Sequence, residues 1–207
     1  MAKRIVQGPI RNKEKTKEKL LLAVGEILKT KGYKALKVND IAAVSGVNKR
    51  LIYEYFGGVD ELADAYIKQQ DYWNVLTKLE RPENAENSSD FVTNILRGQY
   101  DELHRNQELR KIMLWELSEK RDILTEQVDL REANGEQIFQ NLTDPHFGEN
   151  AKRFRAVTAL IIAGSYYLNL IQETNGTTFC GLNLKTEQGR NEIKNAIDFI
   201  IKKTYEK

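Results

Sequence analysis

Residues 38–56 read Val-Asn-Asp-Ile-Ala-Ala-Val-Ser-Gly-Val-Asn-Lys-Arg-Leu-Ile-Tyr-Glu-Tyr-Phe, and they contain two short helical patterns with a turn between them. The first pattern carries its apolar residues on one face and stops at Ser45-Gly46. The second starts at once behind Asn48, whose short polar side chain suits a helix N-cap. Two short helices joined so tightly are typical of a helix-turn-helix.

Three positions support this interpretation, because two helices that cross steeply need little bulk at the crossing and a turn residue that tolerates φ > 0. Ala42 is small, Gly46 follows it by four residues, and Ile52 is an apolar anchor for the second helix on the first. Val47 adds an apolar side chain directly after the glycine. The alternative is an ordinary helical hairpin inside a core.

The continuation of this stretch resembles a known family. Residues 46–56, followed by Asp60-Glu61-Leu62, resemble the DNA-binding signature of the TetR family of bacterial transcriptional regulators. The resemblance is specific for the first third of the chain, and beyond it only length and helical character agree. It implies an all-α fold with an N-terminal three-helix head and a larger helical body. It also implies a homodimer that represses transcription and leaves its palindromic operator when the body binds a small molecule.

The sequence departs from the family pattern at several positions of the head. The family usually has Ser or Thr where Asn48 stands, a small residue at Arg50, Thr or Ser at Leu51, a neutral aromatic or His at Glu54, and Lys at Val59. Leu51 and Val59 therefore lack two usual phosphate contacts, and Glu54 adds a negative charge. Details of the operator do not carry over from the family.

Composition indicates a soluble globular protein: 207 residues, 41% apolar and 30% charged. The single cysteine, Cys180, excludes an internal disulfide framework, and the N-terminus lacks the apolar core of a signal peptide, so we expect a cytoplasmic protein. No motif of an enzyme occurs. His104 and His146 are isolated, and we expect no metal and no cofactor.

Charge is divided unevenly along the chain. Residues 1–57 hold 13 Lys/Arg against 5 Asp/Glu, a net charge of +8, whereas the remainder holds 19 against 25, a net charge of −6. Such a division suggests a head that binds a polyanion, here double-stranded DNA, on an acidic body. Residues 1–12 are basic and weakly patterned, which predicts an N-terminal arm. A solvated basic tail is the alternative.

Side chains at the start of the second motif helix are the expected DNA contacts, since that end of the helix faces base edges and phosphates. Arg50 suits a bidentate contact to guanine, and Lys49 suits a phosphate. Tyr53 has a core position as its alternative, and Phe56 is expected in the core. The candidate DNA-binding residues are Lys37, Asn48, Lys49, Arg50, Tyr53 and Tyr55.

Apolar spacing and helix breakers predict helices along the whole chain. They are expected over about 13–31, 38–45, 48–56, 59–79, 88–105, 109–117, 123–142, 150–174 and 186–205, with a turn at 144–148 and a loop at 177–184. Ser88 or Ser89 and Thr186 are the expected helix caps of the body, and Asn106 is expected to interrupt the helix that precedes it. The predicted domains are a head over 1–57 and a body over 58–207, with residues 59–79 as the linking helix.

Aromatic residues of the body could line an apolar ligand pocket, although aromatic residues at helical spacing more often belong to a plain core. The candidates are Trp73, Tyr100, Trp115, Phe139, Tyr166 and Tyr167. By the family resemblance, the helices over 150–174 and 186–205 would form the dimer's four-helix bundle, with small Gly164 and Ala196 at close approaches. The dimer-interface candidates are Leu160, Gly164, Leu168, Ile193, Ala196, Ile197 and Ile200.

The helix over 150–174 is the most apolar of the chain. Ser165 and Asn169 interrupt its apolar run, which is short for a membrane span, so we expect this helix to be buried in protein. Two other functions stay open at this point: a helical adaptor that binds a protein through the same head, and a DNA-binding protein without a ligand. A palindrome upstream of the chain's own gene would favour the DNA-binding alternatives.

Overall fold

The computed structural model describes residues 9–70 and 88–206, and it confirms the predicted all-α fold. The predicted head contains α1 (Pro9–Lys31), a 3₁₀ turn (Tyr33–Ala35), α2 (Val38–Ser45) and α3 (Arg50–Phe56). Helix α4 (Val59–Gln69), the described part of the predicted linking helix, packs on α1 and α3. Gly32 ends α1 with φ 76°, a backbone angle that favours glycine, and its N–H bonds the carbonyls of Ile27 and Leu28.

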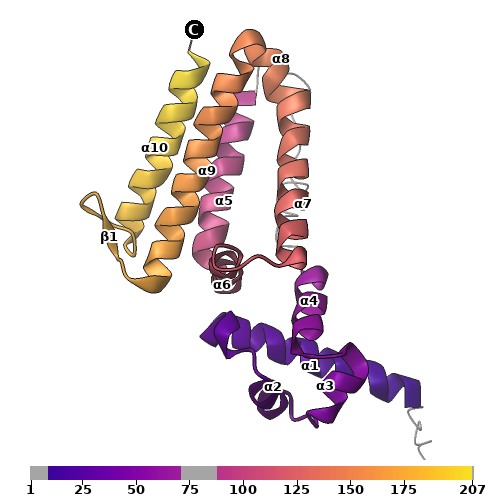
Figure 1. The fold of residues 1–207 in the computed structure, drawn as a ribbon. Coiled ribbons are helices and arrows are strands. Elements are labelled where there is room, and N and C mark those ends of the chain that lie inside the picture. Colours follow the sequence, from indigo (N-terminus) through magenta and orange to yellow (C-terminus); the bar gives the residue numbers. More distant parts are fainter. Residues whose placement is uncertain (1–8, 71–87, 207) are drawn as a thin grey trace, which may run out of the picture.

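The body follows as a separate layer of helices above the head (Figure 1). Its elements are α5 (Ser88–Arg105), α6 (Gln107–Glu116), α7 (Asp122–Ile138), a π turn (Phe139–Thr143), α8 (Asp144–Phe147), a 3₁₀ turn (Gly148–Asn150), α9 (Ala151–Thr174), β1 (Thr178–Phe179), β2 (Leu182–Asn183) and α10 (Glu187–Tyr205). Helix α5 packs against both α9 and α10, whereas α7 stands on the other side of the body.

Two helix starts of the body are capped by side chains, as predicted for Thr186 and not predicted for Asn106. The side chain of Asn106 accepts from the Leu109 N–H at the start of α6, and the Thr186 hydroxyl accepts from the Gly189 N–H at the start of α10. Ser88 is buried and donates its hydroxyl proton to Tyr205 Oη at 2.9 Å. Its side chain therefore links the start of α5 to α10.

Several boundaries differ from the sequence predictions. Helix α1 begins at Pro9, so the last residues of the predicted N-terminal arm, 9–12, are helical. Helix α4 ends at Gln69 and Gln70 is extended, so the predicted linking helix is interrupted ten residues early; the rest of it, with Trp73, lies outside the described residues. The helix predicted to Leu142 changes to a π turn at Phe139, and the predicted turn at 144–148 is the short helix α8. The loop at 177–184 contains the hairpin β1–β2, which turns through Cys180 and Gly181, both with positive φ.

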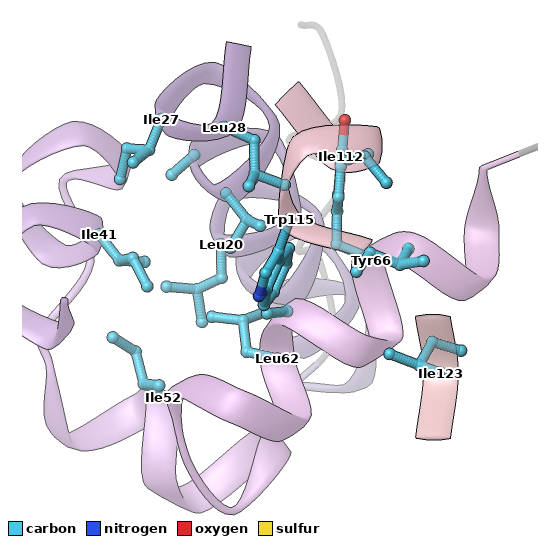
Figure 2. Close-up of a cluster of buried hydrophobic side chains, with 14 of the residues drawn as sticks. Leu20, Ile27, Leu28, Ile41, Ile52, Leu62, Tyr66, Ile112, Trp115 and Ile123 are labelled. Atoms are coloured by element: carbon cyan, nitrogen blue, oxygen red, sulfur yellow. The ribbon is translucent and has the colours of Figure 1, made fainter. Parts of the chain in front are cut away.

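The largest hydrophobic core runs from the head into the body without a break. Leu20 of α1, Ile41 of α2, Ile52 of α3 and Leu62 of α4 are fully buried, and Trp115 of α6 belongs to the same cluster (Figure 2). A second cluster fills the space between α5, α9 and α10, with Tyr100 and Phe154 as its largest members. The head is therefore packed on the body and not merely tethered to it.

Helix α9 buries its polar stripe and exposes part of its apolar surface. Within the residues that the structure describes, one helical run, Asp122–Thr174, contains a stretch long and apolar enough to cross a membrane by length and composition; 33% of that stretch is buried inside the chain. Thr158, Ser165 and Asn169 face inward and are buried, whereas Leu160 is 75% exposed. The sequence predicts that α9 is buried in protein, and only one of its faces is buried within this chain.

Candidate nucleic-acid interface

The turn between α2 and α3 has the geometry that the sequence predicts. Gly46 is left-handed, with φ 66° and ψ 20°, and its N–H bonds the Ala42 carbonyl at 3.0 Å. The Asn48 side chain accepts a hydrogen bond from the Arg50 N–H at 2.9 Å, which is the contact of a helix N-cap. Because the cap holds the backbone of the first turn of α3, it also sets the positions from which the side chains of that turn extend.

The candidate DNA-binding side chains project from one exposed region around this turn. Lys37, Asn48, Lys49 and Arg50 are exposed, and Tyr53 is 56% exposed, which excludes the alternative that Tyr53 is a core residue. Phe56 packs against the core of the head, as predicted. The first turn of α3 therefore offers two cations and a phenol to a partner, with Glu54 as an exposed negative charge nearby in sequence.

Tyr55 lies differently from Tyr53, since it is half-buried and its ring is covered by a residue of α1. The ammonium nitrogen of Lys13 stands 5.1 Å from the centre of the Tyr55 ring. Sequence analysis did not single out Lys13. The run of lysines at the start of α1 could have indicated a contact between Lys13 and the recognition helix. The sequence alone, however, does not show that this end of α1 lies beside α3.

The head is held to the body by two groups of contacts with α6 and the segment after it. Tyr33 stacks on Trp115 with ring centroids 5.2 Å apart, and Tyr66 donates its hydroxyl proton to Glu108 at 2.6 Å. A Cβ at Gly25 of α1 would collide with the Tyr66 hydroxyl, so a glycine is required where α4 crosses α1. These contacts join α1, α4 and α6 into one unit.

Arg121 makes the second group of contacts. Its guanidinium bonds Asp60 at 2.9 Å and Asp64 at 2.6 Å, both on α4, and it lies 5.0 Å from the ring centre of Trp115. Burial lowers the pKa of Arg121, but the hydrogen bonds that it donates to Asp64 and Asp60 outweigh burial and raise the pKa above its usual value. The residue was not singled out from the sequence, because its partners lie about sixty positions away.

The ligand-pocket candidates do not gather at one place. Tyr166 and Tyr167 line a pocket between α6 and α9. Tyr100 is fully buried in the core between α5, α9 and α10, and Trp115 faces the head. Phe139 lies under the guanidinium of Arg155, 4.7 Å from the ring centre.

The dimer-interface candidates on α9 and α10 differ in how far they are exposed. Leu160 and Ile200 are exposed large apolar residues, Ala196 is exposed, and Gly164, Leu168 and Ile193 are half-buried. Ile197 is only 4% exposed and packs in the core of its own chain, so it offers no surface to a partner. Tyr167 and Phe199 are exposed on the same two helices, and Phe199 had not been singled out.

The family model "Bacterial regulatory proteins, tetR family" matches residues 25–66, which contain the helix-turn-helix. Among curated protein sequences, none is significantly similar to this chain.

Two solved structures share the fold. A protein described as a TetR-family transcriptional regulator from Rhodococcus sp. is 20% identical, with a TM-score of 0.59 over 90% of this chain and 99% of that one. NalD of Pseudomonas aeruginosa, the secondary repressor of the MexAB-OprM multidrug efflux pump, is 16% identical, with a TM-score of 0.53 over 93% and 96% of the two chains. The helix-turn-helix segment of this chain therefore matches the TetR family model, and its all-α fold is shared with two regulators, one of them described as a member of that family.

Proposed function

We propose that the chain is a homodimeric repressor that binds a palindromic operator and leaves it when a small molecule binds the body. The observation that carries the proposal is the capped, exposed first turn of α3, where Lys49 and Arg50 stand together. Arg50 reads a guanine in the major groove, and Lys49 contacts a phosphate. Repression is supported by the fold shared with NalD, a repressor.

Exposed apolar residues on α9 and α10 support the dimer. Leu160 and Tyr167 lie seven residues apart on α9, which puts them two turns apart on one face, and Phe199 is 62% exposed on α10. Several large apolar side chains on two neighbouring helices are more than a monomer usually leaves in water. We assign them to a four-helix bundle with the same helices of a second copy, and not to a membrane.

A dimer also explains how the two recognition helices would bind one operator. Two recognition helices related by a two-fold axis bind half-sites about one helical turn, or a multiple, apart, so the operator is a palindrome. The protein acts in the cytoplasm, where it meets DNA, and the function requires no catalytic step. The head is residues 1–57 and the body is residues 58–207, with the head's core continued into α6.

The proposal is tested with Leu160→Glu, which puts a charge at the centre of the proposed interface. We expect the variant to sediment as a monomer and to bind the duplex upstream of the chain's own gene at least about tenfold more weakly, because the two heads no longer bind together. Leu130→Glu, at an exposed leucine of α7, is the matched control and should leave both properties unchanged. A wild-type protein that is monomeric at full DNA affinity, or that binds no duplex, would contradict the proposal.

A further inference from the structure

Glu54 is a carboxylate on the exposed face of α3. On the opposite face, Ile52 is fully buried and points into the core of the head (Figure 2). Successive residues of a helix are turned by about 100°, so Arg50 and Glu54 each point about 160° away from Ile52 and only about 40° from each other. Tyr53 is exposed on the same side of the helix. The face that α3 turns to a partner therefore carries a guanidinium, a phenol and a carboxylate.

The position of Glu54 within α3 does not favour a negative charge. Glu54 lies two residues before the end of a seven-residue helix, and the free carbonyl groups of a helix end repel a carboxylate. Arg50 precedes Glu54 by four residues, which is the less favourable order for an ion pair along a helix. Among residues 9–70 and 88–206, Glu54 has no ion-pair partner. Helix stability therefore does not explain an acidic residue at this position.

A DNA duplex offers a carboxylate few partners. Its phosphates repel negative charge, and the hydrogen-bond donors on the base edges of the major groove are the amino groups at cytosine N4 and adenine N6. The adenine amino group lies between two acceptors, adenine N7 and thymine O4, whereas the cytosine amino group has one acceptor beside it, guanine O6. A carboxylate in the major groove therefore binds cytosine better than adenine.

We propose that Glu54 reads a cytosine in each half-site of the operator, close to the guanine that Arg50 reads. The inference rests on the proposed function and adds a specificity-determining residue to its DNA contacts. Arg50 and Glu54 are separated by about 6 Å along the axis of α3, and base pairs are stacked about 3.4 Å apart. The two side chains therefore reach base pairs that are one or two steps apart.

The same carboxylate acts against DNA of the wrong sequence. Lys49 and Arg50 attract any duplex, because every duplex carries the same phosphates. Where no cytosine amino group is present, Glu54 loses water and gains no hydrogen bond, and it lies beside base acceptors and phosphates. Glu54 therefore increases the ratio of specific to non-specific binding by weakening the binding of all other sequences.

The test begins with the full-length wild-type protein, which selects its binding sites from a randomised duplex library. The selected half-site is then varied one base pair at a time, and the affinities are measured by fluorescence anisotropy. We expect cytosine to be preferred roughly 5–150-fold at one base pair. That pair should lie one or two steps from the guanine whose preference is lost in Arg50→Ala.

Two variants of Glu54 and one control identify the residue responsible. Glu54→Gln should transfer the preference at this base pair from cytosine to adenine, because a glutamine amide pairs with adenine N6 and N7. Glu54→Ala should show little preference there, and both variants should bind random duplex more tightly than the wild type does. Glu26→Gln makes the same change of charge at an exposed position of α1, and it should keep the preference for cytosine. Because Glu54 is on the surface, both of its variants should melt close to the wild-type temperature.

Two results would overturn the inference while the proposed function stands. The first is a base preference that both Glu54 variants retain, even if their affinity for all sequences rises equally. The second is a loss of preference at the base pair that Arg50 reads, which would mean that Glu54 positions Arg50 and touches no base. A wild-type protein that selects no duplex from the library would instead contradict the proposed function.

Discussion

Arg50 and Lys49 are neighbours at the start of α3, and their different chemistry predicts different effects on DNA binding. Arg50→Ala should cost roughly 1–3 kcal/mol on the true operator and relax the preference at one base pair. Lys49→Ala should weaken binding to all sequences about equally. Lys185→Ala, an exposed lysine beside the hairpin, is the control. Affinities for a set of single-base operator variants measure both effects, and the reverse pattern would mean that the two residues exchange roles.

Asn48 has two roles that one pair of variants separates. Asn48→Ala removes the cap of α3 and should lower the free energy of unfolding by about 1 kcal/mol in urea titrations. Asn48→Ser keeps a capping oxygen and should stay within a few tenths of the wild type. If the serine variant is as stable as the wild type but binds operator more weakly, Asn48 contacts DNA directly; if both variants keep full stability, the cap is not important.

At the scale of elements, most helices were predictable because their signals are local. Gly32 ends α1, Gly46 ends α2, and Asn106 and Thr186 start α6 and α10, each through a bond to a backbone group within five residues. The candidate residues of α3 were predictable for the same reason. Gln70 and the hairpin after α9 have no such signal.

The features that the sequence could not predict depend on contacts between residues far apart in the sequence. Aromatic composition marked Trp115 as a pocket candidate, yet its partners are Tyr33 and Arg121, and the first of these is in the head. Spacing on α10 marked Ile197 as an interface residue, but α5 and α9 already cover it. Periodicity shows that a face is apolar, and only the fold shows what covers it.

Arg121 is the residue through which the α6–α7 segment binds α4, so its loss should loosen α4 on the body. Its carboxylate partners Asp60 and Asp64 are substantially exposed, and the shared core and the Tyr66–Glu108 bond still join α4 to the body, so Arg121→Leu should loosen α4 locally and change the free energy of unfolding by only about 0–1 kcal/mol. The expected result is faster amide exchange in α4.

Arg97→Leu breaks an ion pair with Asp198 inside the body and serves as the matched control for Arg121→Leu. It should leave the exchange in α4 unchanged. If α4 exchanges in Arg121→Leu as slowly as in the wild type, the Tyr33–Trp115 stack and the Tyr66–Glu108 bond hold the head on the body instead.

For the whole molecule, the separation of charge between head and body predicts how salt acts on DNA binding. Each chain has a net charge of +8 in residues 1–57 and −6 in the remainder, so the attraction to DNA is concentrated in the head, while the acidic body is repelled. If the two heads of a dimer neutralise about six to eight phosphates, the slope of log affinity against log salt concentration should be about −5 to −7, because each neutralised phosphate releases counterions.

The monomeric variant Leu160→Glu supplies the internal comparison, because one head meets half of the phosphates and its slope should be about half as steep. Lys49→Ala should reduce the slope of the dimer by about two, one phosphate for each head. Titrations of a fluorescent operator duplex at several salt concentrations give all three slopes. A wild-type slope near zero would mean that the positive charge of the head does not contribute to DNA binding. Equal slopes for the wild type and Leu160→Glu would mean that only one head of the dimer touches DNA.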